Sequence, residues 1–208
     1  MASRYPEDTM TLSHRPQRAV PQRRVAVYCG SSDGNSPAYL AEARALGAAI
    51  AAAGLGMVYG GASVGLMGAV ADAALVGGSH VIGVLPAVLF DREIGHTGIT
   101  TLERVTTMHE RKARMTELAD AFLILPGGYG TLEEMAEAVT WAQLGLHAKP
   151  VVFINTAGYW NPLLTFLDSA VAAGFLLQQN RALLQLVPSA SAAVAIVAAL
   201  KPRQRPLA

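Results

Sequence analysis

The feature that most constrains this chain is a glycine-rich segment between an apolar stretch and a helical one. Its nine residues are Pro126, Gly127, Gly128, Tyr129, Gly130, Thr131, Leu132, Glu133 and Glu134. It follows the apolar residues 121–125 and leads into residues 132–146, whose composition is strongly helical. A strand that delivers such a turn onto a helix N-terminus forms an anion site, because backbone N–H groups and the helix dipole converge there and absent Cβ atoms let a phosphate approach. Phosphate is therefore the first ligand to consider.

The same residues also fit an ordinary helix start. Thr131 can cap the helix while Glu134, three residues later, reaches back to the backbone N–H of Thr131. Such a cap does not by itself require three glycines and a proline before it. The segment therefore has two interpretations, a capping box and a turn shaped for a ligand, and its glycines favour the second.

Apolar runs alternate with helical stretches along the rest of the chain. The strands are expected at residues 25–28, 57–59, 81–84, 101–105, 121–125, 151–155 and 184–187. The helices are expected at residues 37–53, 66–76, 107–119, 132–146, 160–174 and 190–200. This alternation predicts an α/β fold, a doubly wound parallel sheet of about seven strands with helices on both faces.

Three loops rich in small residues follow predicted strands, at residues 30–34, 60–65 and 126–131. In a parallel sheet, the loops after the strands lie at one edge, where ligands bind, so these three can line one crevice. The loop at 60–65 matches neither the dinucleotide signature nor the P-loop signature, which argues against NAD and ATP. No cofactor is expected.

Composition limits the domain count and the partners. A chain of 208 residues with 52% apolar side chains can form one domain, expected at residues 25–200. Residues 1–24 carry three prolines and five arginines and are expected to be a disordered arm, and residues 201–208 a loose tail. The low charged fraction of 15% leaves apolar surface that a second copy can cover, which predicts a homodimer.

The chain lacks the marks of several other protein classes. A net charge of +1 without a basic stripe gives no reason to expect nucleic acid. No apolar run reaches the roughly 20 residues that span a bilayer, and no secretory signal is recognisable, so a cytoplasmic protein without a membrane partner is expected. Cys29 is the only cysteine and is expected to be a small buried residue rather than a nucleophile.

A second candidate site element lies on the helix that a capping box at Thr107 and Glu110 opens. At about 100° per residue, Arg111 falls inside the apolar stripe of this helix, between Met115 and Leu118. An unpaired charge there costs several kcal/mol, so an anion should meet the guanidinium unless it snorkels or pairs with a structural carboxylate. Glu134, a bound phosphate, or both are the candidates.

Several motifs together resemble one family. They are residues 108–112, the glycine-rich segment, and the stretches 29–32, 59–61, 65–68 and 140–145. Over residues 25–188 the chain resembles the lonely-guy (LOG) family of cytokinin riboside 5'-monophosphate phosphoribohydrolases. The resemblance implies a Rossmann-like homodimer that hydrolyses the N-glycosidic bond of N6-substituted AMP, such as isopentenyl-AMP, or of AMP itself, to the free base and ribose 5-phosphate.

The resemblance also implies roles for individual residues. Arg111 and Glu134 would be the catalytic pair. The nucleotide contacts would come from Glu93, Lys112, Gly128, Tyr129, Gly130, Thr131, Leu132, Glu133 and Thr140. Thr140 fits least easily, because six residues beyond Glu134 it points about 120° away and lies roughly 9 Å further along the helix.

The implied reaction agrees with the residue chemistry. Breaking a ribosyl C–N bond builds oxocarbenium character, which the Glu134 carboxylate can stabilise while activating water. Arg111 can stabilise the leaving purine or hold the phosphate, and both roles stay open. A nucleotide-sensing binding module without turnover is the alternative. Lysine decarboxylase chemistry on pyridoxal phosphate has little support from the three lysines, and none of the five histidines has metal-ligand spacing, so no metal is expected.

Overall fold

The computed structural model describes residues 21, 23–89 and 95–200. Most of the predicted arm, the predicted tail at 201–208, and Glu93 therefore lie outside the described residues. Arg24 was predicted to be the last residue of the arm, but it is the first residue of the first strand. The guanidinium of Arg23 donates hydrogen bonds to three carbonyl groups at the end of the last helix, which belong to Val197, Ala198 and Leu200.

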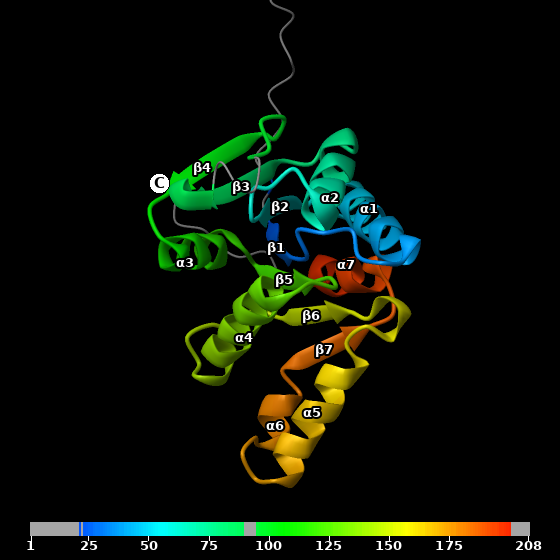
Figure 1. Ribbon diagram of the computed structural model, residues 1–208, viewed down its shortest axis with the longest axis vertical. Coiled ribbons are helices and arrows are strands. Elements are labelled where there is room, and N and C mark those ends of the chain that lie inside the picture. Colours follow the sequence, from blue (N-terminus) through cyan, green and yellow to red (C-terminus); the bar gives the residue numbers. More distant parts are fainter. Residues whose placement is uncertain (1–20, 22, 90–94, 201–208) are drawn as a thin grey trace, which may run out of the picture.

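A seven-stranded sheet, parallel throughout, forms the centre of the molecule (Figure 1). Its strands are β1 (Arg24–Tyr28), β2 (Gly56–Tyr59), β3 (Val81–Pro86), β4 (Thr101–Val105), β5 (Ala121–Ile124), β6 (Val151–Ile154) and β7 (Leu184–Val187). Their order across the sheet is β4-β3-β2-β1-β5-β6-β7. The predicted α/β fold with about seven strands is confirmed.

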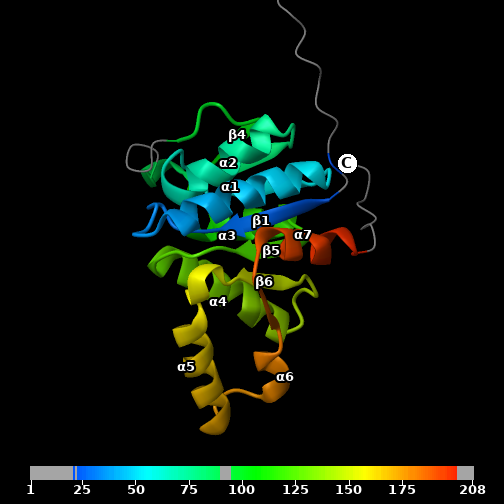
Figure 2. The ribbon, with the colours of Figure 1, turned by 90° about the vertical axis from the view of Figure 1, so that its right-hand side faces the viewer.

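Helices cover both faces of the sheet. They are α1 (Pro37–Ala52), α2 (Gly65–Val76), α3 (Met108–Leu118), α4 (Tyr129–Gln143), α5 (Asn161–Ala172), α6 (Gln178–Arg181) and α7 (Ala190–Ala198), with two short 3-10 turns at Ala87–Leu89 and Thr156–Gly158. One face packs against α1, α2 and α7, and the other against α3 and α4 (Figure 1 and Figure 2). The short helix α6 was not predicted, because its sequence, Gln-Gln-Asn-Arg, has no apolar periodicity. No helix in the described ranges has the length and apolar character needed to cross a membrane.

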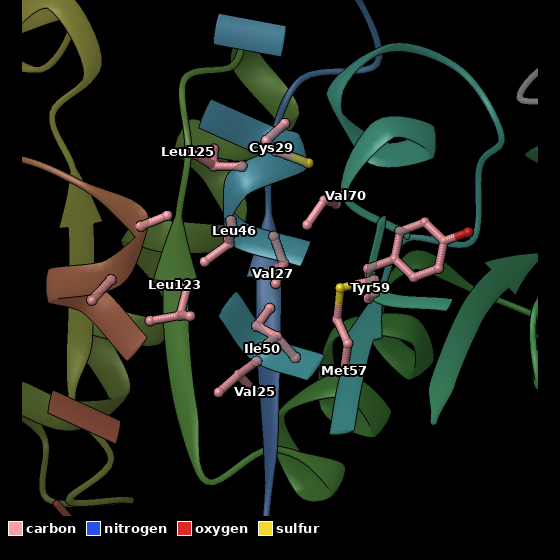
Figure 3. Packing of buried hydrophobic residues seen from close by; sticks show 14 of the residues in the cluster. Val25, Val27, Cys29, Leu46, Ile50, Met57, Tyr59, Val70, Leu123 and Leu125 are labelled. Carbon is pink, nitrogen blue, oxygen red and sulfur yellow. The ribbon is translucent and has the colours of Figure 1, made fainter. Parts of the chain in front are cut away.

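The central strand β1 is buried on both faces, which fixes it in the core. Val25 and Val27 point toward α1, where they meet Leu46 and Ile50 (Figure 3). Alternate residues of β1 point to the α3 and α4 face. Because side chains alternate between the two faces of a strand, a continuous apolar run is what a strand covered on both sides requires.

The chain direction across the sheet reverses at β1. After β1 the chain builds β2, β3 and β4 on one side, and then crosses to β5, β6 and β7 on the other. The loops that follow β1 and β5 are thus neighbours, and the backbone N–H of Gly30 donates to the carbonyl of Pro126 at 3.0 Å. Ligands bind at such a switch point in open α/β sheets, because the two loops diverge there and leave a crevice.

The helix after the glycine-rich segment begins earlier than predicted. Helix α4 starts at Tyr129 rather than at residue 132, and its N-cap is Gly128, with no hydrogen bond from a capping side chain. The capping-box interpretation of Thr131 is therefore wrong. Thr131 lies inside the first turn and is buried beneath Gly127, so its hydroxyl group cannot act as the cap. The helix also ends sooner, because Gly145 adopts a positive φ of 73°.

The capping box predicted for α3 is confirmed. The hydroxyl of Thr107 accepts the backbone N–H of Glu110 at 3.1 Å, and the Glu110 carboxylate accepts the backbone N–H of Thr107 at 3.4 Å. This reciprocal pair starts α3 at Met108. The start of α3 fixes the direction in which the next turn of side chains, including Arg111, points.

Candidate active site

Two adjoining cavities lie beyond the carboxyl ends of β1 and β5. The first, of about 230 Å³, is lined by Cys29, Gly30, Ser31, Met67, Leu89, Met108, Arg111, Gly128, Tyr129, Gly130, Thr131, Glu133 and Glu134. The second, of about 440 Å³, shares Gly30, Ser31 and Gly128 with the first and extends along the loop at residues 31–35 toward Tyr39 and Tyr159. The glycine-rich segment forms the wall between them.

Arg111 is buried in the wall of the first cavity, as the helical periodicity of α3 predicts. The residue is only 5% exposed. Its Nη2 atom lies 3.8 Å from the Oε1 atom of Glu134 and 3.4 Å from the carbonyl oxygen of Gly60, to which it donates. Its Nε atom has no hydrogen-bond partner among the described residues. A buried guanidinium with contacts this long is poorly satisfied, and an anionic ligand in the cavity would stabilise it.

Glu134 faces Arg111 from the second turn of α4. It is 9% exposed and lines the same cavity. Its charge also acts on two buried neighbours: burial raises the pKa of the Tyr28 phenol and of the Cys29 thiol, and the carboxylate raises both further. The Cys29 thiol therefore stays protonated at neutral pH, which agrees with the expectation that it is not a nucleophile.

The glycines of the segment serve two different purposes. A Cβ atom on Gly127 would lie 2.1 Å from Thr131 Oγ1 and 2.8 Å from the backbone nitrogen of Gly30, so packing requires glycine there. A Cβ atom on Gly128 or Gly130 would meet no described atom within 4 Å, and neither residue has a positive φ. The open space at these two glycines leaves room for a ligand to approach the helix N-terminus closely.

The remaining predicted site residues divide into two groups. Tyr129, Thr131 and Glu133 line the first cavity with the glycines. Leu132 and Thr140 do not: Leu132 packs against the apolar core under α4, and Thr140 is exposed further along the helix. Glu93 lies outside the described residues, so the structure does not place it.

Lys112, the next residue after Arg111, lines neither cavity, although its ion-pair partner Glu133 lines the first. Its side chain is 5% exposed, and its ammonium forms ion pairs with Glu133 and Glu137 of α4. Burial alone would lower the pKa of this ammonium, but the hydrogen bonds and the charges of the two carboxylates together outweigh burial and raise it. Lys112 is therefore a fully charged cation inside the α3 and α4 layer.

Several residues of the site were not predicted from the sequence. Ser31 lies in both cavities, although only its small-residue loop was noted, and Met67, Leu89 and Met108 form an apolar wall in the first. The hydroxyl group of Tyr159 donates to the carbonyl oxygen of Gly127 at 2.6 Å. This contact holds the glycine-rich segment from the side of the sheet on which β6 lies. Nothing in the local sequence of Tyr159 indicates this contact, because 32 residues separate the two partners.

The arrangement can bind and polarise an anionic ligand. The first residues of α4, whose backbone N–H groups have no intrahelical acceptor, line the cavity, a guanidinium lies in its wall, and a carboxylate lies beside that guanidinium. The N–H groups suit phosphate, and the carboxylate suits a developing positive charge. Among the described residues, no group of three or more His, Cys, Asp and Glu side chains could hold a metal ion.

Comparison with known sequences identifies close relatives. A family model described as "Possible lysine decarboxylase" matches residues 67–197. Cytokinin riboside 5'-monophosphate phosphoribohydrolase LOG7 of Arabidopsis thaliana is 50% identical over 168 residues, which cover 81% of this chain and 77% of that protein. Cytokinin riboside 5'-monophosphate phosphoribohydrolase LOG of Oryza sativa subsp. japonica is 48% identical over 168 residues, which cover 81% and 69%.

Solved structures share the fold at low sequence identity. The molybdenum cofactor carrier protein of Chlamydomonas reinhardtii superposes with a TM-score of 0.64 at 22% identity, covering 84% of this chain and 95% of that one. The molybdenum cofactor binding protein of Rippkaea orientalis gives 0.64 at 21% identity, covering 84% and 94%. These likenesses concern the fold alone.

The decarboxylase description of the family model does not fit the site. Pyridoxal phosphate requires a lysine amine that can reach the ligand. Of the two lysines inside the described ranges, Lys112 is held by two carboxylates and Lys149 donates to the carbonyl of Thr116. Neither lines the cavity that holds Arg111 and Glu134.

Proposed function

We propose that this chain, which belongs to the lonely-guy (LOG) family of cytokinin riboside 5'-monophosphate phosphoribohydrolases, hydrolyses the N-glycosidic bond of N6-substituted AMP. The products are the free base and ribose 5-phosphate, so the reaction activates a cytokinin. Residues 25–200 form the hydrolase domain. The observation that carries this proposal is the shared cavity of Arg111, Glu134 and the glycine-rich helix N-terminus.

In this reaction Glu134 is the catalytic carboxylate. Water attacks C1' of the ribose, and the C1'–N9 bond breaks with its electron pair going to the purine, which takes up a proton. The ionised carboxylate stabilises the oxocarbenium character of the sugar and accepts a proton from the attacking water. Its burial strengthens both effects, because charges interact more strongly away from bulk water.

The start of α4 binds the 5'-phosphate, and Arg111 supplies a fixed positive charge beside it. The backbone N–H groups of residues 129–131 are the first of the helix and have no intrahelical acceptor. The open space at Gly128 and Gly130 lets phosphate oxygens approach these groups closely. Contacts of Glu93 and Thr140 with the nucleotide remain predictions from the family resemblance.

A binding module without turnover is less well supported. A site that only binds an anion gains nothing from a carboxylate 3.8 Å from its arginine, because the carboxylate repels the anion and competes for the cation. A hydrolase needs that carboxylate. The pair of opposite charges therefore favours catalysis.

Turnover by the purified protein tests the proposal. We expect incubation with isopentenyl-AMP, and with AMP for comparison, to release free base and ribose 5-phosphate in equal amounts. Chromatography of the base and an enzymatic assay of the sugar phosphate measure the two products independently. Nucleotide binding without release of base would contradict the proposal and favour the sensor.

We also propose that the protein forms a homodimer through the surface of α5 and α6. None of the α5 residues is buried, although its sequence is largely apolar. The two helices lie beyond β7 at one end of the molecule (Figure 1 and Figure 2). The large exposed apolar residues of this region and of the end of α4 are Leu144, Leu146, Phe166, Phe175 and Leu177. Large exposed apolar side chains of this kind are typical of an interface between subunits.

Light scattering after size-exclusion chromatography measures the oligomeric state. We expect the mass of a dimer for the wild type and of a monomer for a Phe166→Glu, Phe175→Glu variant, since two buried charges would cost several kcal/mol at the interface. Both side chains are largely exposed in the protomer, at 66% and 90%, so the circular dichroism spectrum should not change. If the variant stays dimeric, the interface lies elsewhere on the surface.

The single, unpaired Cys29 supports a reducing compartment, and we place the enzyme in the cytoplasm.

A further inference from the structure

We propose that Tyr159 is a positioning residue, whose hydroxyl group fixes the orientation of the peptide between Gly127 and Gly128 so that the N–H of Gly128 is presented to the phosphate of the ligand. This inference rests on the proposed function and deepens it, because it adds a residue that sets phosphate affinity through the backbone. Tyr159 follows β6 and lies outside the motifs that carry the family resemblance.

The hydroxyl group of Tyr159 holds a peptide that its own two residues constrain only weakly. It donates to the carbonyl oxygen of Gly127 at 2.6 Å. A glycine on each side leaves this peptide unusual freedom to rotate, because neither residue has a Cβ atom. A peptide unit is planar and trans, so its N–H points in the direction opposite to its C=O. A carbonyl held toward Tyr159 therefore directs the N–H of Gly128 away from Tyr159.

This direction leads to the first cavity, where Arg111 and Glu134 lie. Tyr159 lines the second cavity and not the first, whereas Gly128 lines both. Within the described ranges, no backbone carbonyl accepts the N–H of Gly128, although its own carbonyl accepts the N–H of Leu132 at 3.0 Å. The N–H of Gly128 thus joins the first N–H groups of α4 as a donor for phosphate oxygens.

The loop after β6 is built to keep Tyr159 in one place. Ala157 has a φ of 52°, and in the described part of the chain no other residue except glycine has a positive φ. A backbone conformation of this kind persists only where the surrounding structure fixes it. Here the Oδ1 atom of Asn155 accepts the backbone N–H of Trp160 at 2.8 Å, and the buried Trp160 ring packs edge-on against Phe153. Tyr159 therefore lies between a constrained turn and a buried anchor.

The ring of Tyr159 has a packing role that can be separated from its hydroxyl group. Its centroid lies 5.8 Å from that of Tyr39 on α1, and the two rings meet edge to face. Tyr39 also packs beneath the loop that follows β1, since a Cβ atom on Gly34 would lie 2.7 Å from its ring. Phenylalanine at position 159 keeps these ring contacts and removes only the hydrogen bond. The Tyr159→Phe variant thus isolates the hydroxyl group.

Equilibrium titration of Tyr159→Phe with ribose 5-phosphate tests the proposal. This compound carries the phosphate, and its binding requires no turnover. We expect its Kd to rise about 5- to 10-fold relative to the wild type, the effect of losing one ordinary hydrogen bond. In steady-state kinetics, KM for isopentenyl-AMP should rise by a similar factor, while kcat stays within about three-fold.

Ser79→Ala is the matched control. The hydroxyl group of Ser79 donates to the carbonyl oxygen of Leu55 at the same distance of 2.6 Å, but these residues precede β3 and β2, at the end of the strands opposite to the cavities. The bond is buried, so its loss should lower the melting temperature at least as much as Tyr159→Phe does. The Kd for ribose 5-phosphate should nevertheless stay within about two-fold of the wild type.

Several results would overturn the role of Tyr159. An unchanged Kd in Tyr159→Phe, or an equal loss of affinity in Ser79→Ala, would mean that the hydrogen bond only stabilises the fold. A fall in kcat with an unchanged Kd would place the hydroxyl group in the chemical step. Failure of the wild type to bind ribose 5-phosphate would remove the phosphate site itself. Wild-type turnover decides the proposed function separately: a protein that releases no base but loses affinity in Tyr159→Phe would keep the positioning role and refute the hydrolase.

Discussion

Replacing Glu134 by glutamine is expected to lower kcat for release of the free base by about 1,000-fold, within the range that a positioned acid–base group contributes. Glutamine has nearly the same shape and fits the site, where Glu134 is 9% exposed, but it carries no negative charge. It can neither stabilise the cationic sugar nor accept a proton from water. The substitution also leaves the start of α4 intact, because Gly128 is the N-cap and no side-chain cap is present.

Initial rates with isopentenyl-AMP, and equilibrium binding of the same nucleotide, measure this effect. Binding should be retained or slightly strengthened, since one negative charge near the phosphate is gone. Glu117→Gln is the control, because the Glu117 side chain is 70% exposed on α3 and forms an ion pair with Arg114. Turnover of Glu134→Gln within a few fold of the wild type would exclude Glu134 as the catalyst.

Replacing Arg111 by lysine is expected to lower kcat/KM by about 100- to 1,000-fold although the positive charge is kept. The guanidinium reaches both Glu134 and the Gly60 carbonyl with one planar group, at 3.8 Å and 3.4 Å. A lysine ammonium is a single point of charge and cannot span both. Loss of one oriented electrostatic contact to developing charge typically costs this much.

Gly60→Ala tests the same position without changing the arginine. A Cβ atom on Gly60 would lie 2.1 Å from Arg111 Nη2 and 3.0 Å from the Met67 sulfur, so the guanidinium must move. We therefore expect a loss of activity of the same order as in Arg111→Lys. The control Arg114→Lys should change kcat/KM by less than about two-fold, because that side chain is partly exposed and outside the cavities.

The kinetic pattern of these variants also separates the two roles left open for Arg111. A rise in Ki for ribose 5-phosphate would mean that the arginine holds the phosphate. A fall in kcat with that Ki unchanged would mean that it stabilises the leaving purine. Full activity of both variants would contradict any role of Arg111 in the reaction.

Most of the fold could be predicted because its signals are local. Most of the strands are short apolar runs rich in β-formers, and helices separate most of them at the spacing that a parallel sheet requires. The burial of Arg111 follows from the periodicity of α3 alone. The start of that helix follows from Thr107 and Glu110, which lie three residues apart.

Contacts between distant segments could not be predicted in the same way. The start of α4 depends on Gly127, which brings Thr131 and Gly30 into close packing, and 97 residues separate Gly30 from Gly127. The hydroxyl of Tyr159 holds the same segment from another element. The sequence pattern shows residues that could form a capping box, but it does not show the packing that makes the helix begin elsewhere.

The sequence by itself determined the α/β fold, the glycine-rich turn before α4 and the inward direction of Arg111, because each depends on residues a few positions apart. Only the tertiary structure decided that Arg111 faces Glu134 and that Lys112 faces Glu133 and Glu137. Those pairs form when α3 and α4 pack on one face of the sheet. That packing depends on the strand order, which local periodicity does not encode.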